Sequence, residues 1–525
     1  MPKVLISDKL SPSAVEIFQN RGIDADVKVG LSKEELIDIV GQYDGLAVRS
    51  ATKVTADVMA AAINLKVIGR AGIGVDNIDL PAATAKGIVV MNTPFGNSIT
   101  TAEHAIALMM SLSRQIPAAN VSTQAGKWEK SRFMGTEVTS KTLGIIGCGN
   151  IGSIVASRAK GLQMKVVAYD PYLSDEKAVE LGVEKVDFDA FLARSDFISL
   201  HTPLTDETRN ILNADAISKT KKGVRIINCA RGGLIDEAAL KAALESGHVA
   251  GAALDVFLEE PAKENDLFGT ENFIATPHLG AATREAQENV ALQIAEQMSD
   301  FLLTGAVANA INMPSISADE AAEMGPFIRL AEQLGLFAGQ LTESGIKGVQ
   351  IEYEGEVARM NTKALTAAAL EGLMRPIVSE VNMVNAPVIA KERGIRLSEI
   401  TRDAQGVYES YIRFTVTTER QTRSVAGTVF SDGSPRIIQV KNIDMEALVS
   451  PHMLYVTNED KPGFIGALGN VLGEAGLNIA TFNLGRSKPG EDAIALIAID
   501  EPISAETLEK VAALPFVKQA KALSF

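Results

Sequence analysis

Cysteine is nearly absent from this chain. The two cysteines, Cys148 and Cys229, are far apart in a sequence of 525 residues, and each lies within an apolar stretch. A disulfide framework or a cysteine-based zinc site needs more thiols than this, so the sequence excludes both classes of protein. We therefore expect a chain without a bound metal, working in a reducing, cytoplasmic compartment.

Long apolar runs and an excess of positive charge are missing as well. No run of uncharged apolar residues is long enough for a membrane span, and the N-terminal MPKVLISDKL holds too few apolar residues for the core of a signal peptide. The formal net charge is −15, without any run rich in Lys and Arg. We therefore expect neither a membrane nor a nucleic acid as a partner.

The composition that remains is that of a globular protein, with 46% hydrophobic and 22% charged residues. At roughly 150 residues per domain, the length predicts three or four domains. Residues 1–96 alternate short apolar runs with helix-like stretches, which predicts a small parallel sheet. A helix over SITTAEHAIALMMSLSRQIP, ending at Pro117, is followed by six apolar strands before residue 280, which predicts a doubly wound sheet.

The C-terminal half predicts two further units. An amphipathic helix over residues 282–305 is followed by residues 306–325, which are rich in small residues and which we interpret as a linker with a domain boundary near residue 310. Residues 311–450 have a mixed α+β pattern. Residues 451–525 follow the order βαββαβ, which is typical of a ferredoxin-like module.

One glycine-rich stretch, LGIIGCGNIGSIVASRAKGLQMKVVAYD, predicts a dinucleotide site. Gly147 and Gly149 follow an apolar strand and allow backbone N–H groups to approach a pyrophosphate, while Gly152 permits close helix packing. The next strand ends at Asp170, where a carboxylate accepts hydrogen bonds from the adenosine ribose. Because Asp170 would repel a 2′-phosphate and no Arg follows it closely, we expect NAD rather than NADP as the cofactor.

Among the five histidines, His278 is the strongest candidate for acid–base chemistry. It ends the last strand of the second sheet, at the carboxyl edge where such folds bind ligands. A histidine there can take the proton of an alcohol as hydride leaves, and a neighbouring carboxylate would favour its charged form. Both Glu259 and Glu260 in DVFLEEP qualify. Arg231, directly after a strand in NCARGGLID, is placed to hold a substrate carboxylate.

Several segments resemble one known family. GRAGIGVDNIDL, MNTPFGNS, GKWEKSRFMGTE, NCARGGLIDE and ALDVFLEEP are similar to segments of the D-isomer-specific 2-hydroxyacid dehydrogenases, and among these to the long-form D-3-phosphoglycerate dehydrogenases, over essentially the whole chain. The resemblance implies an α/β protein with a Rossmann-type NAD-binding domain, residues 97–280, inserted in a flavodoxin-like substrate domain, residues 1–96 and 281–310. An α+β intervening domain, residues 311–450, and a ferredoxin-like ACT domain, residues 451–525, would follow.

The resemblance also implies roles for single residues. The family's catalytic arginine, its glutamate before proline and its histidine in a Pro-His pair fall on Arg231, Glu260 and His278, which favours Glu260 over Glu259. The implied reaction is oxidation of 3-phosphoglycerate to 3-phosphohydroxypyruvate with NAD, the first step of serine biosynthesis. Beyond the glycine loop and Asp170, the implied lining of the NAD site is Ile73, Asn150, Ile151, Thr202, Cys229, Ala230, Arg231, Asp255, His278 and Gly280.

A phosphorylated substrate requires cations beyond Arg231, because a buried phosphate needs charge-assisted hydrogen bonds. Arg49 and Arg70 end apolar strands of the first unit, and Arg132 lies in EKSRFMG. The family's dimers imply that the segment with Arg132 reaches the neighbouring subunit. The expected substrate residues are Arg49, Ser50, Arg70, Gly72, Asn97 and Arg132.

The C-terminal segment TNEDKPGFIGALGNVLGEAGLNIATFNLGR resembles the amino-acid-binding motif of ACT domains. The resemblance implies a site for L-serine where two modules meet, with the ammonium near Asp460 and with Asn478 on the facing side. A module that serves only assembly into a homodimer or homotetramer is the alternative.

Two other functions are alternatives to the NAD-dependent oxidation of 3-phosphoglycerate. A reductase of unphosphorylated 2-keto acids would leave the phosphate-directed arginines unpaired. A NAD-sensing corepressor is disfavoured by the ACT-like tail.

Overall fold

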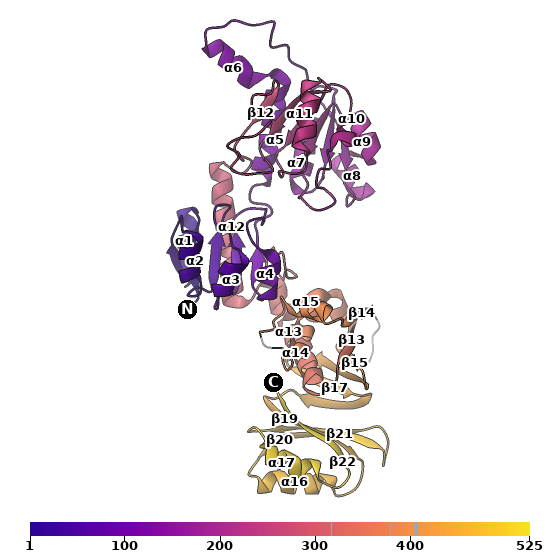
Figure 1. Cartoon of the computed structure of the whole chain (residues 1–525). Helices are drawn as coiled ribbons and strands as arrows, with labels where there is room; N and C mark the ends of the chain where they lie inside the picture. Colours follow the sequence, from indigo (N-terminus) through magenta and orange to yellow (C-terminus); the bar gives the residue numbers. More distant parts are fainter. Residues whose placement is uncertain (317, 379, 404–407) are drawn as a thin grey trace.

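The computed structural model describes residues 1–316, 318–378, 380–403 and 408–525. Its four sheets lie one after another along an elongated molecule (Figure 1). The second sheet of the chain occupies one end, the first sheet lies next to it, and the third and fourth sheets follow toward the other end. The chain therefore runs from the first sheet to the second and back before it enters its C-terminal half.

The first sheet is parallel and has the strand order β2-β1-β3-β4-β5. Alternate strand residues pack on opposite faces: Val4 of β1 joins the core under α1 and α12, and Leu5 joins the core under α2 and α3. Gly69 of β4 has no room for a side chain because Met298 of α12 lies against it. The elements are β1 (Lys3–Ile6), α1 (Pro12–Asn20), β2 (Asp24–Val27), α2 (Lys33–Val40), β3 (Gly45–Val48), α3 (Ala56–Ala61), β4 (Val67–Arg70), α4 (Leu80–Ala85), β5 (Val89–Met91) and the returning helix α12 (Arg284–Thr304).

The helix that leaves the first sheet is shorter than the sequence predicts. α5 (Ser98–Arg114) ends before Pro117 because Gln115 takes a left-handed conformation with φ 51°. Pro117 lies in the first turn of a second helix, α6 (Ile116–Gln124), where the missing N–H of a proline costs no hydrogen bond. α6 and the loop after it project from the end of the molecule (Figure 1).

The second sheet is parallel, with the strand order β12-β11-β10-β9-β6-β7-β8. The order reverses between β6 and β9, which is the crossover where doubly wound folds bind dinucleotides. All six predicted strands are present, and the two-residue strand β8 extends one edge. The elements are β6 (Thr142–Ile146), α7 (Asn150–Gly161), β7 (Lys165–Tyr169), α8 (Asp175–Leu181), β8 (Glu184–Lys185), α9 (Phe188–Arg194), β9 (Phe197–Leu200), α10 (Ala214–Ser218), β10 (Val224–Asn228), α11 (Glu237–Glu245), β11 (Val249–Leu254) and β12 (Phe273–Ala275).

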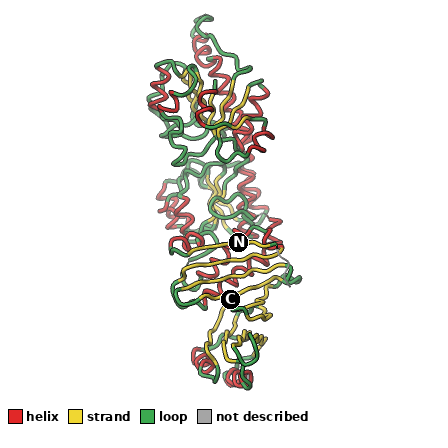
Figure 2. The backbone as a smooth tube through the Cα atoms, turned by 90° about the vertical axis from the view of Figure 1, so that its right-hand side faces the viewer, coloured by secondary structure: helices red, strands yellow, loops and turns green. Residues whose placement is uncertain are grey.

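The third sheet mixes parallel and antiparallel pairs in the order β14-β13-β15-β16-β17-β18. Its strands run across the long axis of the molecule (Figure 2). α13 packs on this sheet and α14 packs on α13, so closely that a side chain at Gly335 would overlap the carbonyl group of Ala369. The elements are α13 (Ala318–Gln340), β13 (Ile346–Gly355), α14 (Thr362–Met374), α15 (Ala386–Glu392), β14 (Arg396–Arg402), β15 (Ser410–Thr418), β16 (Thr422–Val429), β17 (Pro435–Val440) and β18 (Ile443–Leu448).

The predicted linker over residues 306–325 is only partly a linker, because α13 already begins at Ala318. Its alanines and glutamates are strong helix formers, and composition alone did not separate a helix start from a connecting segment.

The fourth sheet is antiparallel, with the order β20-β21-β19-β22 that a ferredoxin-like module requires. Leu454 of β19 packs in the core that includes residues of α16 and α17, whereas Tyr455 of the same strand joins the core of the third sheet. One face of the module is therefore shared with its neighbour. The elements are β19 (His452–Glu459), α16 (Phe464–Glu474), β20 (Ile479–Arg486), β21 (Asp492–Ile499), α17 (Ala505–Ala512) and β22 (Val517–Ser524). Across the described residues, no helix combines the length and apolar character that crossing a bilayer requires.

Candidate active site

Gly147 and Gly149 form the turn between β6 and α7, and Gly152 lies in the first turn of α7. Neighbouring backbone fills the space of a side chain at Gly147 and at Gly152, whereas Gly149 is open. Gly147 has φ 85°, a left-handed conformation, and a Cβ there would lie 2.7 Å from the carbonyl oxygen of His201. A Cβ on Gly152 would overlap the carbonyl oxygen of Gly147. Gly149 is the N-cap of α7 and provides no side-chain cap, so the first N–H groups of the helix can bind an anion.

Asp170 follows β7 and faces this turn. Its Oδ2 accepts a hydrogen bond from the backbone N–H of Cys148 at 2.8 Å, and its Oδ1 accepts one from the N–H of Tyr172 at 2.8 Å. A carboxylate has about four acceptor positions, so two remain for ribose hydroxyls. An uncapped helix start beside a fixed carboxylate fits NAD, and Asn150 and Ile151 form the first turn of that helix.

Asp255 follows β11 and holds the loop that carries His278. This fully buried carboxylate accepts hydrogen bonds from the N–H of Leu279 at 2.7 Å, from the N–H of Gly280 at 2.8 Å and from the hydroxyl of Thr276 at 2.6 Å. Burial opposes its ionisation, but His104 of α5, at 3.3 Å, and these donors hold the pKa of Asp255 below its usual value. Asp255 is thus ionised, and its hydrogen bonds fix the loop that carries His278.

His278 and Glu260 form a hydrogen-bonded pair. Nδ1 of His278 lies 2.7 Å from Oε2 of Glu260, and Oε1 of Glu260 accepts a hydrogen bond from the N–H of Phe257 at 3.0 Å. Among the described residues, no contact of this kind is found for Glu259. Glu260, rather than Glu259, is therefore the carboxylate that contacts His278, through Nδ1 of the ring.

The two members of this pair stabilise each other's charge. The hydrogen bond to Glu260 raises the pKa of His278, while partial burial and the positive charge of Arg231 oppose the rise. Burial opposes ionisation of Glu260, but its hydrogen bonds from His278 and from the N–H of Phe257 lower its pKa. The pair is thereby suited to hold a proton on the imidazole beside an ionised carboxylate.

Arg231 connects the two sheets. It follows β10, and its Nε donates to Oδ2 of Asp76 in the loop after β4 at 3.0 Å. Asn228 fixes the turn from which Arg231 projects, donating from Nδ2 to the carbonyl oxygen of Arg231 at 2.9 Å. A side chain on Gly74 would overlap the guanidinium. Arg231 thus lies at the junction of the two sheets, and its carboxylate partner comes from the opposite sheet.

Arg70 is the most deeply placed cation of this junction. Burial, followed by the charges of Arg231 and Arg49, lowers its pKa to about 10. Its Nη1 donates to the carbonyl oxygen of Ala71 at 2.8 Å, but its Nε is buried and has no partner in the described part of the chain. A side chain on Gly72 would overlap this guanidinium. Arg70 is therefore a cation with unused hydrogen-bonding capacity.

Three further predicted substrate residues lie at or near the same edge of the first sheet. Arg49 follows β3, where Oδ2 of the buried Asp8 accepts its backbone N–H at 2.6 Å, and exposed Ser50 comes next. Asn97 precedes α5, and its Oδ1 is buried without a partner among the described residues. Arg231 and Arg49 both lie close enough to lower the pKa of Arg70, and Asp76 and Asp8 oppose this effect, so the three arginines cluster with two carboxylates at this edge.

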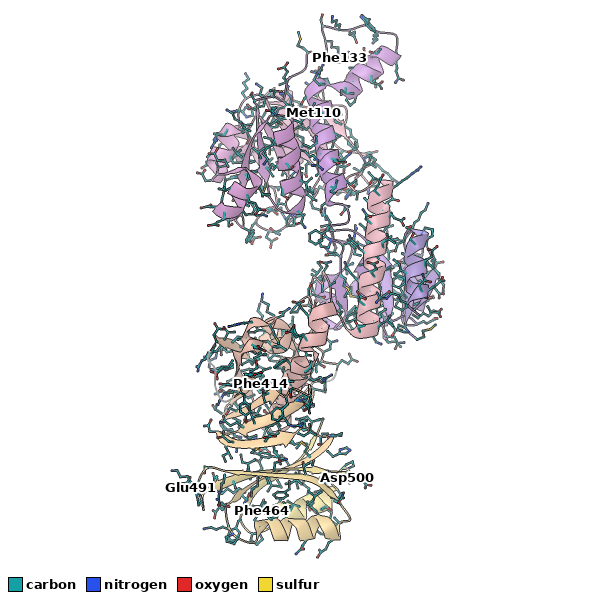
Figure 3. All side chains as sticks on the ribbon, turned by 180° about the vertical axis from the view of Figure 1, so that it is seen from behind. Met110, Phe133, Phe414, Phe464, Glu491 and Asp500 are labelled. Carbon is teal, nitrogen blue, oxygen red and sulfur yellow. The ribbon has the colours of Figure 1, made fainter. Side chains whose placement is uncertain are left out.

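Within one copy of the chain, Arg132 lies far in space from these three arginines. It is in the loop after α6, where its Nη1 lies 3.1 Å from Oε2 of Glu129, and Phe133 beside it is at the far end of the molecule (Figure 3). Trp128 and Met134 of the same loop are exposed.

Asp460 and Asn478 also lie apart. The N–H of Asp460 donates to the carbonyl oxygen of Glu491, and Nδ2 of Asn478 donates to Oδ2 of Asp500 at 2.7 Å. Glu491 and Asp500 stand at opposite ends of the fourth sheet (Figure 3). Within one chain these two side chains therefore do not form one site.

Comparisons with known proteins agree with this architecture. Family models match residues 106–280 as the NAD-binding domain of D-isomer-specific 2-hydroxyacid dehydrogenases, residues 323–441 as a D-3-phosphoglycerate dehydrogenase intervening domain and residues 452–516 as an ACT domain. The chain is 45% identical to the D-3-phosphoglycerate dehydrogenase of Synechocystis sp., covering 99% of this chain and 94% of the relative, and 42% identical to that of Bacillus subtilis, covering 99% of each. The chain belongs to the D-3-phosphoglycerate dehydrogenase family.

Membership of this family makes the chain a NAD-dependent dehydrogenase with an ACT domain. A solved glyoxylate reductase from Paecilomyes thermophila is 32% identical, with a TM-score of 0.55, and covers 59% of this chain and 98% of its own. The resemblance of the motifs to D-3-phosphoglycerate dehydrogenases and the predicted fold class are thus confirmed.

Sequence reasoning missed the residues that hold the site in place. Asp76, Asp8 and Asn228 each fix an arginine or the turn that carries it. Asp8 and Asn228 lie at or just after the carboxyl end of a strand, and that position was the available signal, whereas Asp76 lies farther along the loop after β4. Their partners, however, come from other strands or from the opposite sheet, which a single sequence does not reveal.

Proposed function

We propose that this chain oxidises 3-phosphoglycerate to 3-phosphohydroxypyruvate, with His278, Glu260 and Arg231 as its catalytic residues. The observation that carries the proposal is the His278–Glu260 pair near Arg231, Arg70 and Arg49; of these three arginines, only Arg231 forms an ion pair, with Asp76, among the described residues. A proton acceptor next to three cations suits a hydroxy acid with two anionic groups. The names of the curated relatives support the same substrate.

Each residue has a separate task in this proposal. Bound NAD supplies a ring that accepts hydride, and the uncapped start of α7 with Asp170 would hold its pyrophosphate and ribose. His278 takes the hydroxyl proton on Nε2, and Glu260 stabilises the imidazolium through Nδ1. Arg231 exchanges Asp76 for the substrate carboxylate. Arg70 and Arg49 bind the phosphate, and Ser50, Gly72 and Asn97 complete that site.

The proposal extends to the remaining predicted cofactor residues. Ile73 lies in the loop after β4, and Thr202, Cys229 and Ala230 follow β9 and β10, at the carboxyl edges that face each other. Together with Asp255 and Gly280 they would line the nicotinamide side of NAD. Burial raises the pKa of the Cys229 thiol, so Cys229 acts there as a neutral wall.

We also propose the division of labour between domains. The substrate domain comprises residues 1–96 and 281–310, and the NAD-binding domain comprises residues 97–280. The intervening domain, residues 311–450, connects these two domains to the ACT domain, residues 451–525, which regulates the activity. The three matched family regions and the four separate sheets support these boundaries. Arg132 then belongs to the site of a neighbouring subunit in a homodimer or homotetramer.

L-Serine is the proposed effector of the ACT domain. Asp460, whose pKa is lowered by the N–H of Gly490 and by Arg486, offers a carboxylate for an ammonium group. Asn478 pairs with Asp500 and Asp460 with Glu491, and these two partners lie at opposite ends of the sheet, so a site with both residues requires two copies of the chain. Serine should lower the activity of the wild type, and Asp460→Ala and Asn478→Ala should each abolish this response while leaving the basal rate unchanged.

The reaction itself is tested by following NAD reduction with purified full-length protein. We expect NADH formation with D-3-phosphoglycerate and none with the L enantiomer, when the product is trapped to draw the reaction forward. His278→Asn should abolish turnover but retain NADH binding, since the ring lies at the edge of the cofactor site. Equal rates with glyoxylate or lactate as with the phosphorylated substrate would overturn the proposed specificity.

A further inference from the structure

The loop after β3, residues 49–52, is held from two sides. It carries Arg49 and Ser50, two of the residues proposed to bind the substrate phosphate. On one side lies the buried carboxylate of Asp8, whose Oδ2 accepts the backbone N–H of Arg49 at 2.6 Å and that of Thr52 at 3.2 Å. Its Oδ1 accepts the hydroxyl of Thr52 at 2.8 Å. One side chain therefore fixes the N–H groups at both ends of the loop.

Asn77 holds the same loop from its carbonyl groups. It lies in the loop between β4 and α4, and its Nδ2 donates to the carbonyl oxygen of Arg49 and to that of Thr52, each at 2.7 Å. The carbonyl oxygen of Asn77 accepts the N–H of Val54 at 2.8 Å, so its backbone is fixed as well. An amide group has two N–H donors, and Asn77 uses both on this one loop.

The contact with Asn77 sets the direction of a free donor. The carbonyl group of Arg49 and the N–H of Ser50 belong to one planar trans peptide group, so they point in opposite directions. By holding that carbonyl group, Asn77 orients the N–H of Ser50. Among the described residues, no hydrogen bond is found for the backbone N–H of Ser50 or of Ala51, and both residues are exposed. Successive N–H groups without partners are suited to bind an anion.

The residue before Asn77 contacts the opposite sheet. Oδ2 of Asp76 lies 3.0 Å from Nε of Arg231, the arginine proposed for the substrate carboxylate. The segment is held in place, because the N–H of Asp79 donates to the carbonyl oxygen of Val54 at 2.9 Å. Two successive residues thus contact the arginine for one anionic group of the substrate and the loop for the other.

We propose that Asn77 is a positioning residue that selects the phosphorylated substrate by fixing loop 49–52, through which it acts. The inference rests on the proposed oxidation of 3-phosphoglycerate, because it requires a phosphate at Arg49 and Ser50. Without the amide, the peptide group between these two residues is free to turn, and phosphate binding weakens. The hydride and proton transfers do not involve this loop, so KM changes and kcat does not.

Asn77→Leu removes both donors, keeps the branching of the side chain and leaves the charge unchanged. In NADH oxidation we expect KM for phosphohydroxypyruvate to rise about tenfold, as for the loss of two hydrogen bonds, with kcat within about twofold of wild type. For unphosphorylated hydroxypyruvate, kcat/KM should stay within about twofold, so the preference for the phosphorylated ketoacid falls. Asn64→Leu is the matched control: its Nδ2 donates to the carbonyl oxygen of Gly41 at 2.7 Å, before β4 at the amino edge of the sheet, and it should keep the wild-type preference.

Thr52→Val releases the same loop from the side of Asp8, because valine keeps the shape of threonine and lacks the hydroxyl. It should lower the preference in the same direction, about threefold to tenfold, and it provides the test if thermal unfolding shows that Asn77→Leu is not folded. A wild-type preference in the folded variants, or equal losses with both ketoacids, would overturn the inference while the proposed function stands. If the wild type itself does not prefer the phosphorylated ketoacid, the proposed function fails and the inference fails with it.

Discussion

Replacement of Glu260 by Gln tests the proposed proton acceptor with the smallest change in shape. An amide has one acceptor oxygen, whereas the carboxylate uses both oxygens, for the N–H of Phe257 at 3.0 Å and for Nδ1 of His278 at 2.7 Å. If the amide oxygen of Gln at position 260 still accepts the hydrogen bond from the N–H of Phe257, the amide NH₂ group faces Nδ1 of His278. Nδ1 must then be the acceptor, so the neutral ring carries its proton on Nε2. That tautomer is unable to accept the substrate proton.

The expected loss in kcat for oxidation is about 10²- to 10⁴-fold, the range in which a correctly oriented general base contributes. The pH profile gives the second readout. Because Glu260 raises the pKa of His278, oxidation by the wild type increases as pH rises through that raised pKa and the ring becomes neutral. Without the carboxylate the pKa falls, so this limb of the profile moves to lower pH in Glu260→Gln, and proton donation in ketone reduction is lost at a lower pH.

Steady-state kinetics in both directions across pH measure these effects, and an NADH fluorescence titration confirms that the cofactor still binds. Glu259→Gln is the control, and its kcat should stay within about twofold of wild type, as expected for an exposed residue away from the chemistry. A wild-type rate and pH limb in Glu260→Gln would refute the role of the pair.

The remaining predictions concern the cations and the cofactor loop. Arg70→Gln removes a buried cation with unused donors, so KM for the phosphorylated ketoacid should rise about 10- to 100-fold while turnover of hydroxypyruvate changes little; equal losses for both would point to a structural defect. Gly152→Ala places a methyl group against the carbonyl oxygen of Gly147, which should lower the free energy of unfolding by about 1–3 kcal/mol and weaken NADH binding in a fluorescence titration. Gly161→Ala, at an open position of the same helix, is the control and should change neither the free energy of unfolding nor NADH binding. Asp170→Ala should raise the Kd for NAD roughly tenfold or more and the Kd for NADP much less, because the carboxylate that binds the ribose of NAD repels the 2′-phosphate of NADP. An equal rise in both Kd values would exclude a role of Asp170 in the choice of cofactor.

The part of the site that depends on local sequence was predictable. Gly147, Gly149 and Gly152 follow a strand and start a helix, and their conformation depends on neighbours within a few residues. The placement of Arg49, Arg70, Arg231 and His278 was predictable in outline, because carboxyl ends of parallel strands meet at one edge.

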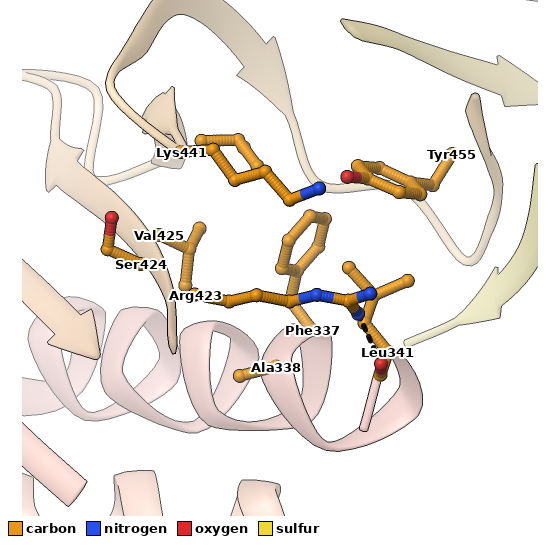
Figure 4. A pocket seen from close by; sticks show the side chains of 9 residues that line it. Phe337, Ala338, Leu341, Arg423, Ser424, Val425, Lys441 and Tyr455 are labelled. Carbon is orange, nitrogen blue, oxygen red and sulfur yellow. Dashed lines mark hydrogen bonds between the residues drawn. The ribbon is translucent and has the colours of Figure 1, made fainter. Parts of the chain in front are cut away.

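What was not predictable depends on contacts between distant segments. The ion pair of Arg231 with Asp76 joins residues of different sheets, and no pattern near either one indicates it. The small void lined by Phe337, Arg423 and Tyr455 requires α13, β16 and β19 to meet at one point (Figure 4), whereas in the sequence Arg423 is indistinguishable from an arginine of a solvated surface. The early start of α13 at Ala318 likewise depends on packing against α14 and on helix-forming residues that also occur in linkers.

The most direct test of the account is the rate of NADH oxidation by the wild type with phosphohydroxypyruvate, compared with unphosphorylated hydroxypyruvate under the same conditions. The cluster of Arg49, Arg70 and Arg231 predicts a kcat/KM at least about 100-fold higher for the phosphorylated ketoacid, since two charge-assisted contacts distinguish the two substrates. Equal kcat/KM values would contradict the claim that Arg49 and Arg70 bind a phosphate and would indicate a general 2-ketoacid reductase.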